Sequence, residues 1–200
     1  MDITYVIATR EHLITQLSEY TTSFDDERKF ISRILELLNH HRAFHRDHLP
    51  GHLTASAWIV NPENTHTLLV HHAKLNRWLQ PGGHADGEEN LLKVAQKEMH
   101  EETGLERIPL LANTIFDLDI HPIPARNNFP EHLHYDVRFA FVASIQQELK
   151  ISDESSDLRW VALNDVPALT RQNHSILRMI QKTVTRQSAL SQRQSPPSRI

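Results

Sequence analysis

The stretch GGHADGEENLLKVAQKEMHEETGL, residues 82–105, decides the fold of this 200-residue chain. Its second half predicts a helix over residues 88–103, with Gly104 as the natural stop. The buried face of this helix is formed by Leu91, Leu92, Ala95 and Met99. Short segments rich in strand formers lie on both sides of the helix in the sequence, so a mixed α/β domain is expected.

Three glutamates on the predicted helix, Glu98, Glu101 and Glu102, lie close together. Like charges three or four positions apart on a helix repel, at roughly 0.2–0.5 kcal/mol per pair. Lys97 can reach Glu101 one turn away, but one lysine does not neutralise three carboxylates. Oxygen ligands and this much negative charge suit Mg²⁺ or Mn²⁺ rather than zinc. The alternative is a solvated acidic patch near the end of a helix.

The segment from Gly83 to Leu105 resembles the Nudix box, the signature of the Nudix hydrolases. That signature reads Gly, five residues, Glu, seven residues, Arg-Glu, an aliphatic residue, any residue, Glu-Glu, any residue, Gly and an aliphatic residue. Every fixed position matches except one, because Lys97 stands where the family has arginine. Lysine does not reproduce the planar, two-pronged hydrogen bonding of arginine, so we expect a looser site that stays active.

The resemblance implies an α/β fold of the Nudix type, an α/β/α sandwich with a mixed sheet. It also implies a Mg²⁺- or Mn²⁺-dependent pyrophosphohydrolase that cleaves a diphosphate linkage by attack of water at phosphorus. The substrate would be a small molecule, a nucleoside diphosphate linked to another group. A bound divalent ion suits this chemistry because it neutralises the phosphates and lowers the pKa of the attacking water.

The same resemblance assigns roles to individual residues. The metal would be held by the backbone carbonyl of Gly82 and by the side chains of four glutamates, Glu89, Glu98, Glu101 and Glu102. Glu89 would be a supporting or outer ligand. Lys97 would act beside the catalytic glutamates. A further acid from a loop outside the box is expected as a base or ligand, and Glu154 in SDESSDLRW is the choice. The alternative for Glu154 is a solvated turn.

The clearest strand in the sequence is HLHYDVRFAFVA, which begins at His132. One face is apolar, and the other carries His132, His134, Asp136 and Arg138. We expect this polar face, together with His84, to bind substrate, with Arg138 pairing with phosphate. Two alternatives remain open. The His-x-His pair could bind a transition metal, or the face could be solvated or packed under the N-terminal extension.

The chain divides into three parts. Residues 1–50 are expected to form a helical N-terminal extension, residues 51–188 the Nudix domain, and residues 189–200 a disordered tail. The two amphipathic helices of the extension would either dock on the domain or form a homodimer with a second copy.

The composition narrows the classes of protein. The net charge of −4 is too small to indicate binding to a nucleic acid polymer or to an anionic membrane. The sequence has no run of about 20 apolar residues and no signal-like N-terminus, so a cytoplasmic protein is expected. The chain contains no cysteine, which excludes thiolate ligands and cysteine nucleophiles.

Three other functions are alternatives to hydrolysis. A non-catalytic Nudix domain that senses a nucleotide would keep the cleft without needing every glutamate. A histidine-rich protein that binds transition metals would be indifferent to Glu102. An isomerase of isoprenyl diphosphates shares the Nudix fold, but its chemistry usually needs a cysteine.

Overall fold

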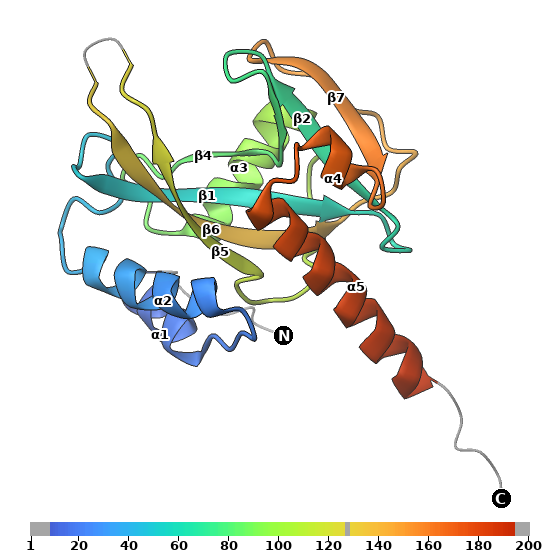
Figure 1. The fold of residues 1–200 in the computed structure, drawn as a ribbon, viewed down its shortest axis with the longest axis horizontal. Helices are drawn as coiled ribbons and strands as arrows, with labels where there is room; N and C mark the ends of the chain where they lie inside the picture. The colour runs from blue at the N-terminus through green and yellow to red at the C-terminus, as the bar shows by residue number, and fades with distance from the viewer. Residues whose placement is uncertain (1–8, 127–128, 195–200) are drawn as a thin grey trace, which may run out of the picture.

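The computed structural model describes residues 9–126 and 129–194. Within these residues a seven-stranded mixed sheet has the order β3-β2-β1-β6-β5, with β4 paired to β1 and β7 paired to β2 (Figure 1). The strands are β1 (Gly51–Val60), β2 (His66–His72), β3 (Arg77–Leu79), β4 (Gly82–His84), β5 (Asp117–Ile123), β6 (His132–Val142) and β7 (Ser155–Ala162).

The centre of the sheet is the parallel pair β1 and β6, and the other pairings are antiparallel. The register sets His52 beside His134, Thr54 beside Asp136 and Ser56 beside Arg138. Since alternate residues of a strand point to the same face, polar residues from two distant segments share one side of the sheet.

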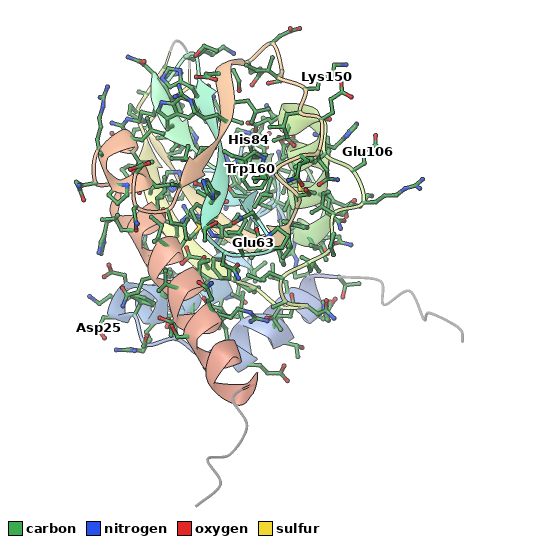
Figure 2. The ribbon with its side chains drawn as sticks, turned by 90° about the vertical axis from the view of Figure 1, so that its right-hand side faces the viewer. Asp25, Glu63, His84, Glu106, Lys150 and Trp160 are labelled. Carbon is green, nitrogen blue, oxygen red and sulfur yellow. The ribbon has the colours of Figure 1, made fainter. Side chains whose placement is uncertain are left out.

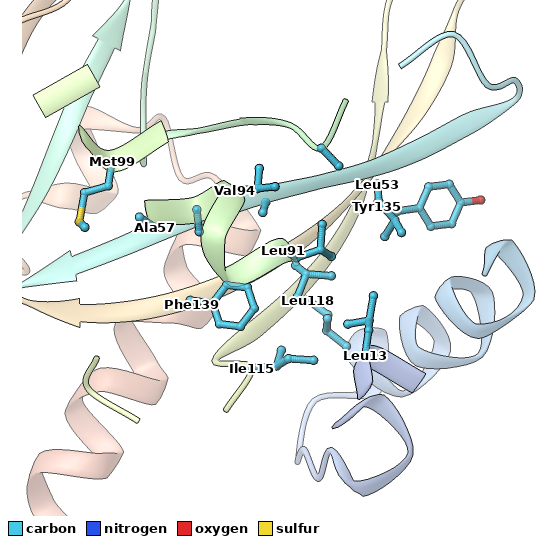
Figure 3. Close-up of a cluster of buried hydrophobic side chains, with 14 of the residues drawn as sticks. Leu13, Leu53, Ala57, Leu91, Val94, Met99, Ile115, Leu118, Tyr135 and Phe139 are labelled. Atoms are coloured by element: carbon cyan, nitrogen blue, oxygen red, sulfur yellow. The ribbon is translucent and has the colours of Figure 1, made fainter. Parts of the chain in front are cut away.

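Helices cover both faces of the sheet, as the sandwich fold predicts. On one face, α3 (Leu91–Thr103) packs with α1 (Arg10–Glu19) and α2 (Asp25–Leu37) on a core that includes Leu53, Leu118 and Phe139 (Figure 3). On the other, α4 (Val166–Leu169) and α5 (His174–Gln194) join a second cluster around Trp58. The apolar stripe predicted for α3 is largely confirmed, since Leu91, Ala95 and Met99 are buried and Leu92 is partly buried.

Local signals explain where α3 begins and ends. The side chain of Asn90 accepts a hydrogen bond from the Lys93 N–H and caps the first turn, so the helix begins at Leu91 rather than at residue 88. It ends at Gly104, which has the left-handed φ of 75° that glycine favours. Helix α5 continues to Gln194, into the segment predicted to be a disordered tail, and residues 195–200 lie outside the described residues.

The N-terminal extension docks on its own domain. Leu13 and Leu17 of α1 are buried in the main core, and Glu27 of α2 accepts a hydrogen bond from the Leu118 N–H at the edge of β5. This hydrogen bond pairs a backbone N–H of the edge strand and holds the extension against the sheet. Among the helices of the described ranges, none combines the length and apolarity needed to cross a membrane.

Candidate active site

The glutamates of α3 meet the backbone of β4. The Gly82 N–H donates a hydrogen bond of 3.1 Å to Glu102 Oε1. A Cβ placed on Gly83 would lie 2.5 Å from the carboxylate carbon of Glu98. The two glycines therefore let the backbone approach both carboxylates more closely than other residues would allow.

These carboxylates differ in exposure. The Glu98 side chain is 13% exposed, whereas that of Glu101 is 53% exposed and lies at the rim. Burial raises the pKa of Glu98 above its usual range, although Lys97 opposes the rise. Burial also raises the pKa of Glu102 to about 7, with the charges of Glu98 and Glu154 adding to it and the Gly82 N–H opposing it.

Lys97 stands between two of the glutamates. Its Nζ lies 3.2 Å from Glu98 Oε1 and 2.8 Å from Glu101 Oε2. The ammonium therefore bridges both carboxylates, but its side chain is 57% exposed, so the pairing contributes little to stability. Among the described residues, Lys97 makes no contact with Glu102. The hydrogen bond to the Glu102 carboxylate comes from the uncharged Gly82 N–H.

This donor set suits a hard divalent cation. Glu98 and Glu102 are carboxylates whose ionised forms are disfavoured by burial and by neighbouring acidic side chains, and a cation would reverse that effect. Oxygen ligands of this kind match Mg²⁺ or Mn²⁺. The roles of Glu98, Glu101, Glu102 and the Gly82 carbonyl as ligands stay predictions consistent with this placement.

Glu89, predicted to be an outer metal ligand, is paired with Arg10 of the N-terminal extension. Its carboxylate accepts hydrogen bonds from the Arg10 backbone N–H at 3.1 Å and from the Arg10 guanidinium at 3.0 and 3.3 Å. The same guanidinium donates to the carbonyls of Leu38, His40 and His41. These contacts make Glu89 a link between the extension and the loop before α3, while its role as an outer metal ligand stays a prediction.

Glu154 and one unpredicted cation lie near the glutamates. Glu154 comes directly before β7, and its charge helps to raise the pKa of Glu102. Arg46 Nε donates to Asp86 Oδ1 at 2.5 Å, and Asp86 together with Glu98 and Glu154 raises the pKa of Arg46. Sequence reasoning missed Arg46 because it lies in the connection HRDHLPG, outside any periodic pattern.

Arg138 and Asp136 do not line an open surface. The Arg138 side chain is 2% exposed, and its guanidinium donates to Asp136 at 2.7 Å, Asp117 at 3.1 Å and Asp119 at 3.2 Å. Asp136 also accepts from the hydroxyls of Thr54 and Ser56. The predicted pairing of Arg138 with substrate phosphate is therefore wrong in this structure, because three buried carboxylates already occupy its donors.

The ion network around Arg138 extends to α5 and the extension. Arg178 donates to Asp117 at 2.8 Å, and Lys182 pairs with Asp117 at 2.9 Å and with Glu27 at 2.5 Å. This matches the alternative in which the polar strand face is packed beneath other elements. Burial opposes the charge of Asp119, but Arg138, His121 and Arg178 together outweigh it and hold the pKa of Asp119 below its usual range.

The predicted histidines do come together. The ring of His134 lies 4.9 Å from that of His84 and 5.2 Å from that of His132, measured between centroids. His52, which sequence reasoning missed, joins them at 5.0 Å from His132 and 5.1 Å from His134. The alternation of His52, Thr54 and Ser56 with apolar residues in GHLTASAW was the signal that could have found it.

Comparisons with known proteins give the family. A model of the NUDIX domain matches residues 50–182. The chain is 29% identical over 97 residues to the asymmetrical bis(5'-nucleosyl)-tetraphosphatase of Rattus norvegicus, a match that covers 48% of this chain and 63% of that protein. The chain thus spans less than two thirds of this curated relative.

Two solved structures share the fold. The MutT protein from Methanosarcina mazei Go1 aligns with a TM-score of 0.52 and 17% identity, covering 68% of this chain and 95% of that one. The dihydroneopterin triphosphate pyrophosphohydrolase of E. coli aligns with a TM-score of 0.54 and 12% identity, covering 66% and 95%. Because the family model matches most of the chain and includes the glutamate helix, this protein belongs to the Nudix family.

Proposed function

We propose that this protein is a Mg²⁺- or Mn²⁺-dependent hydrolase of a phosphoric anhydride bond in a nucleoside-diphosphate-X substrate. One observation carries the proposal: Glu98 and Glu102 meet at the Gly82–Gly83 backbone with raised pKa values. Buried carboxylates that repel one another gain most from a divalent cation. When bound, that ion would neutralise phosphate charge and lower the pKa of a coordinated water.

The residues of the chain have separate tasks in this proposal. Glu98, Glu101 and Glu102 hold the ion, and Glu154 is the further acid that accepts the proton of the attacking water. The oxygen of that water bonds to phosphorus as the bond from phosphorus to the bridging oxygen breaks. Arg46 takes the role first given to Arg138, because its guanidinium is 59% exposed beside the glutamates and can pair with a phosphate of the substrate.

The substrate class is supported by the family and by one relative. The rat protein named as an asymmetrical bis(5'-nucleosyl)-tetraphosphatase is similar over a 97-residue stretch. We therefore put a dinucleoside tetraphosphate first in a panel that also holds nucleoside triphosphates, ADP-ribose, nucleotide sugars and coenzyme A. A homodimer and a cytoplasmic location stay predictions.

The test is phosphate release from this panel in Mg²⁺ and in Mn²⁺, with a coupled phosphatase or pyrophosphatase to identify the product. Glu102→Gln should lose turnover, since it removes a negative ligand. Glu106→Gln is the matched control, because Glu106 lies on the outside of the molecule with a 65% exposed side chain (Figure 2). Nucleotide binding without turnover of any compound would instead support the sensor function.

Arg46 has a test of its own. Arg46→Gln should raise KM for the preferred substrate more than it lowers kcat, because the guanidinium would bind phosphate rather than take part in bond breaking. Arg42→Gln is the matched control, since Arg42 pairs with Asp47 on the same connection. An unchanged KM in Arg46→Gln would remove Arg46 from the substrate site.

A further inference from the structure

A cluster of histidines lies at one end of the central strands. His52 of β1 stands beside His134 of β6 in the sheet register, and His132 lies two residues before His134 on the same face. One ring nitrogen from each of these three side chains lies within 4.8 Å of the others. Imidazoles grouped in this way are ligands of divalent transition metals.

The surroundings fix which nitrogen of two of these rings is free. His52 Nδ1 lies 3.2 Å from the His48 carbonyl oxygen, and His132 Nδ1 lies 3.0 Å from the Pro130 carbonyl oxygen. A carbonyl only accepts hydrogen bonds, so both Nδ1 atoms carry the proton and both Nε2 atoms carry a lone pair. A carbonyl behind the imidazole is a common support for a metal ligand.

Two ring nitrogens of the cluster lack hydrogen-bond partners among the described residues. His52 Nε2 and His134 Nε2 are buried and have no hydrogen-bond partner among the described residues. His52 is 0% exposed, so a lone pair there has been removed from water without compensation. A buried polar atom of this kind calls for a ligand that the chain itself does not supply.

Burial favours the neutral, metal-binding form of two of these rings, those of His52 and His134. Burial lowers the pKa of His52, although the His48 carbonyl opposes the shift. Burial also lowers the pKa of His134 to about 2, and the charges of His84 and His121 add to this effect. A neutral imidazole has a nitrogen lone pair that can bind a metal ion.

We propose that His52, His132 and His134 form a binding site for a divalent transition metal ion, Zn²⁺ in the first place, separate from the carboxylate site on α3. Zinc–nitrogen bonds are about 2.0–2.1 Å long, so small rotations of the rings would bring the nitrogens onto one ion. The ring of His84 lies 5.2 Å from that of His52 and 4.9 Å from that of His134, so His84 is the candidate for a fourth ligand.

The two sites differ in chemistry while sharing β4. Gly82 and Gly83 contact the glutamates of α3, and His84 follows them in the strand and joins the histidines. Carboxylate oxygens select Mg²⁺ or Mn²⁺, whereas imidazole nitrogens select zinc, nickel, copper or cobalt. An excess of Mg²⁺ therefore occupies the carboxylates without competing for the histidines.

The test uses the full chain, stripped of metal and kept in excess Mg²⁺. Titration with Co²⁺ is followed by its visible ligand-field absorption, and displacement by Zn²⁺ is followed by calorimetry. The wild type should bind one ion per chain, and Glu98→Gln should bind it equally well. The double variant His132→Ala/His134→Ala should lose affinity by more than about a hundredfold, because it lacks two of three ligands.

Two controls keep the result interpretable. His12→Ala/His41→Ala removes two histidines outside the cluster and should bind as the wild type does. If the double alanine variant does not fold, His132→Gln is used instead, because the glutamine amide N–H can replace the ring as donor to the Pro130 carbonyl. The absence of saturable one-to-one binding in the wild type, or unchanged affinity in a folded variant of the cluster, would overturn the proposal.

Discussion

Gly83 lies directly beneath the carboxylate of Glu98, close enough that a Cβ on residue 83 would meet both of its oxygens at 2.5 and 2.8 Å. The colliding group is the far end of a flexible side chain rather than backbone. We therefore expect Gly83→Ala to displace the Glu98 carboxylate while leaving the fold intact. Turnover and Mg²⁺ affinity should fall by at least about tenfold, and the melting temperature should hardly change.

Gly51→Ala provides the contrast. A Cβ there would lie 2.6 Å from the Leu133 carbonyl oxygen and 2.7 Å from the Tyr135 ring, both on the neighbouring strand β6. This variant should lose stability, seen as a lower melting temperature, because overpacking of a core costs about 1–3 kcal/mol. A Gly83→Ala enzyme as active as the wild type would show that Glu98 is not held in position by this contact.

The contribution of Glu102 to the stability of the metal-free protein should fall as the pH rises from about 4.5 to about 7, against the rise that His84 and His134 contribute because burial lowers their pKa values. Burial raises the pKa of Glu102 to about 7, well above the ordinary value of about 4.5, so in that window the folded state holds a proton that the unfolded state has lost. Because only the native state binds this proton, the contribution of Glu102 to stability decreases as the pH rises, by at most about 3 kcal/mol. Urea unfolding at several pH values, without divalent ions, measures the slope.

Two comparisons isolate Glu102 in this experiment. Glu102→Gln cannot titrate, so its stability should rise more with pH between about 4.5 and about 7 than that of the wild type, whereas Glu106→Gln should leave the wild-type pH dependence unchanged. Added Mg²⁺ should stabilise the wild type more strongly above pH 7 than at pH 5, because the ion competes with the proton. A pH slope that is the same in the wild type and in Glu102→Gln would contradict the raised pKa.

Arg138 should prove essential to stability rather than to substrate binding. Arg138→Met leaves Asp136 without a cationic partner among the described residues and removes one of the cations that face Asp117 and Asp119, which keep Arg178. Breaking one partner of a buried ion pair costs about 3–5 kcal/mol, which is a large part of the stability of a typical domain. Urea unfolding should therefore show a much lower midpoint.

Arg159→Met is the matched control for Arg138, because Arg159 pairs with Asp157 at the surface with a 54% exposed side chain. Its loss should cost less than about 1 kcal/mol. A folded and stable Arg138→Met enzyme with a raised KM would return Arg138 to the substrate site.

Glu89 should behave as a structural residue. Glu89→Gln weakens its contacts with Arg10, a pair of which both members are partly exposed, so we expect a loss of about 1 kcal/mol. Mg²⁺ affinity measured by calorimetry should stay within about twofold of the wild type, while Glu98→Gln should lose it. Weakened Mg²⁺ binding in Glu89→Gln without a change in stability would support the outer-ligand role.

The sequence alone was enough to predict what depends on spacing along the chain. The glutamates at helical intervals, the stop at Gly104 and the alternation of β6 are local patterns, and each is present in the structure. Local periods are reliable because a helix or a strand presents the same face at fixed intervals whatever lies beyond it. The Nudix fold itself followed from the box for the same reason, since its fixed positions lie in one continuous segment.

Tertiary structure decided which polar side chains are buried and with whom. His134 and Arg138 share one face of β6 and looked equivalent in sequence, yet the first meets His52 and the second meets Asp117 and Asp119. The difference comes from the register with β1 and β5 and from α5, whose Arg178 joins the ion network. Glu89 likewise accepts a hydrogen bond from Arg10, which lies 79 positions away in the sequence. Partners this distant leave no periodic trace in the sequence, because only packing of separate elements brings them together.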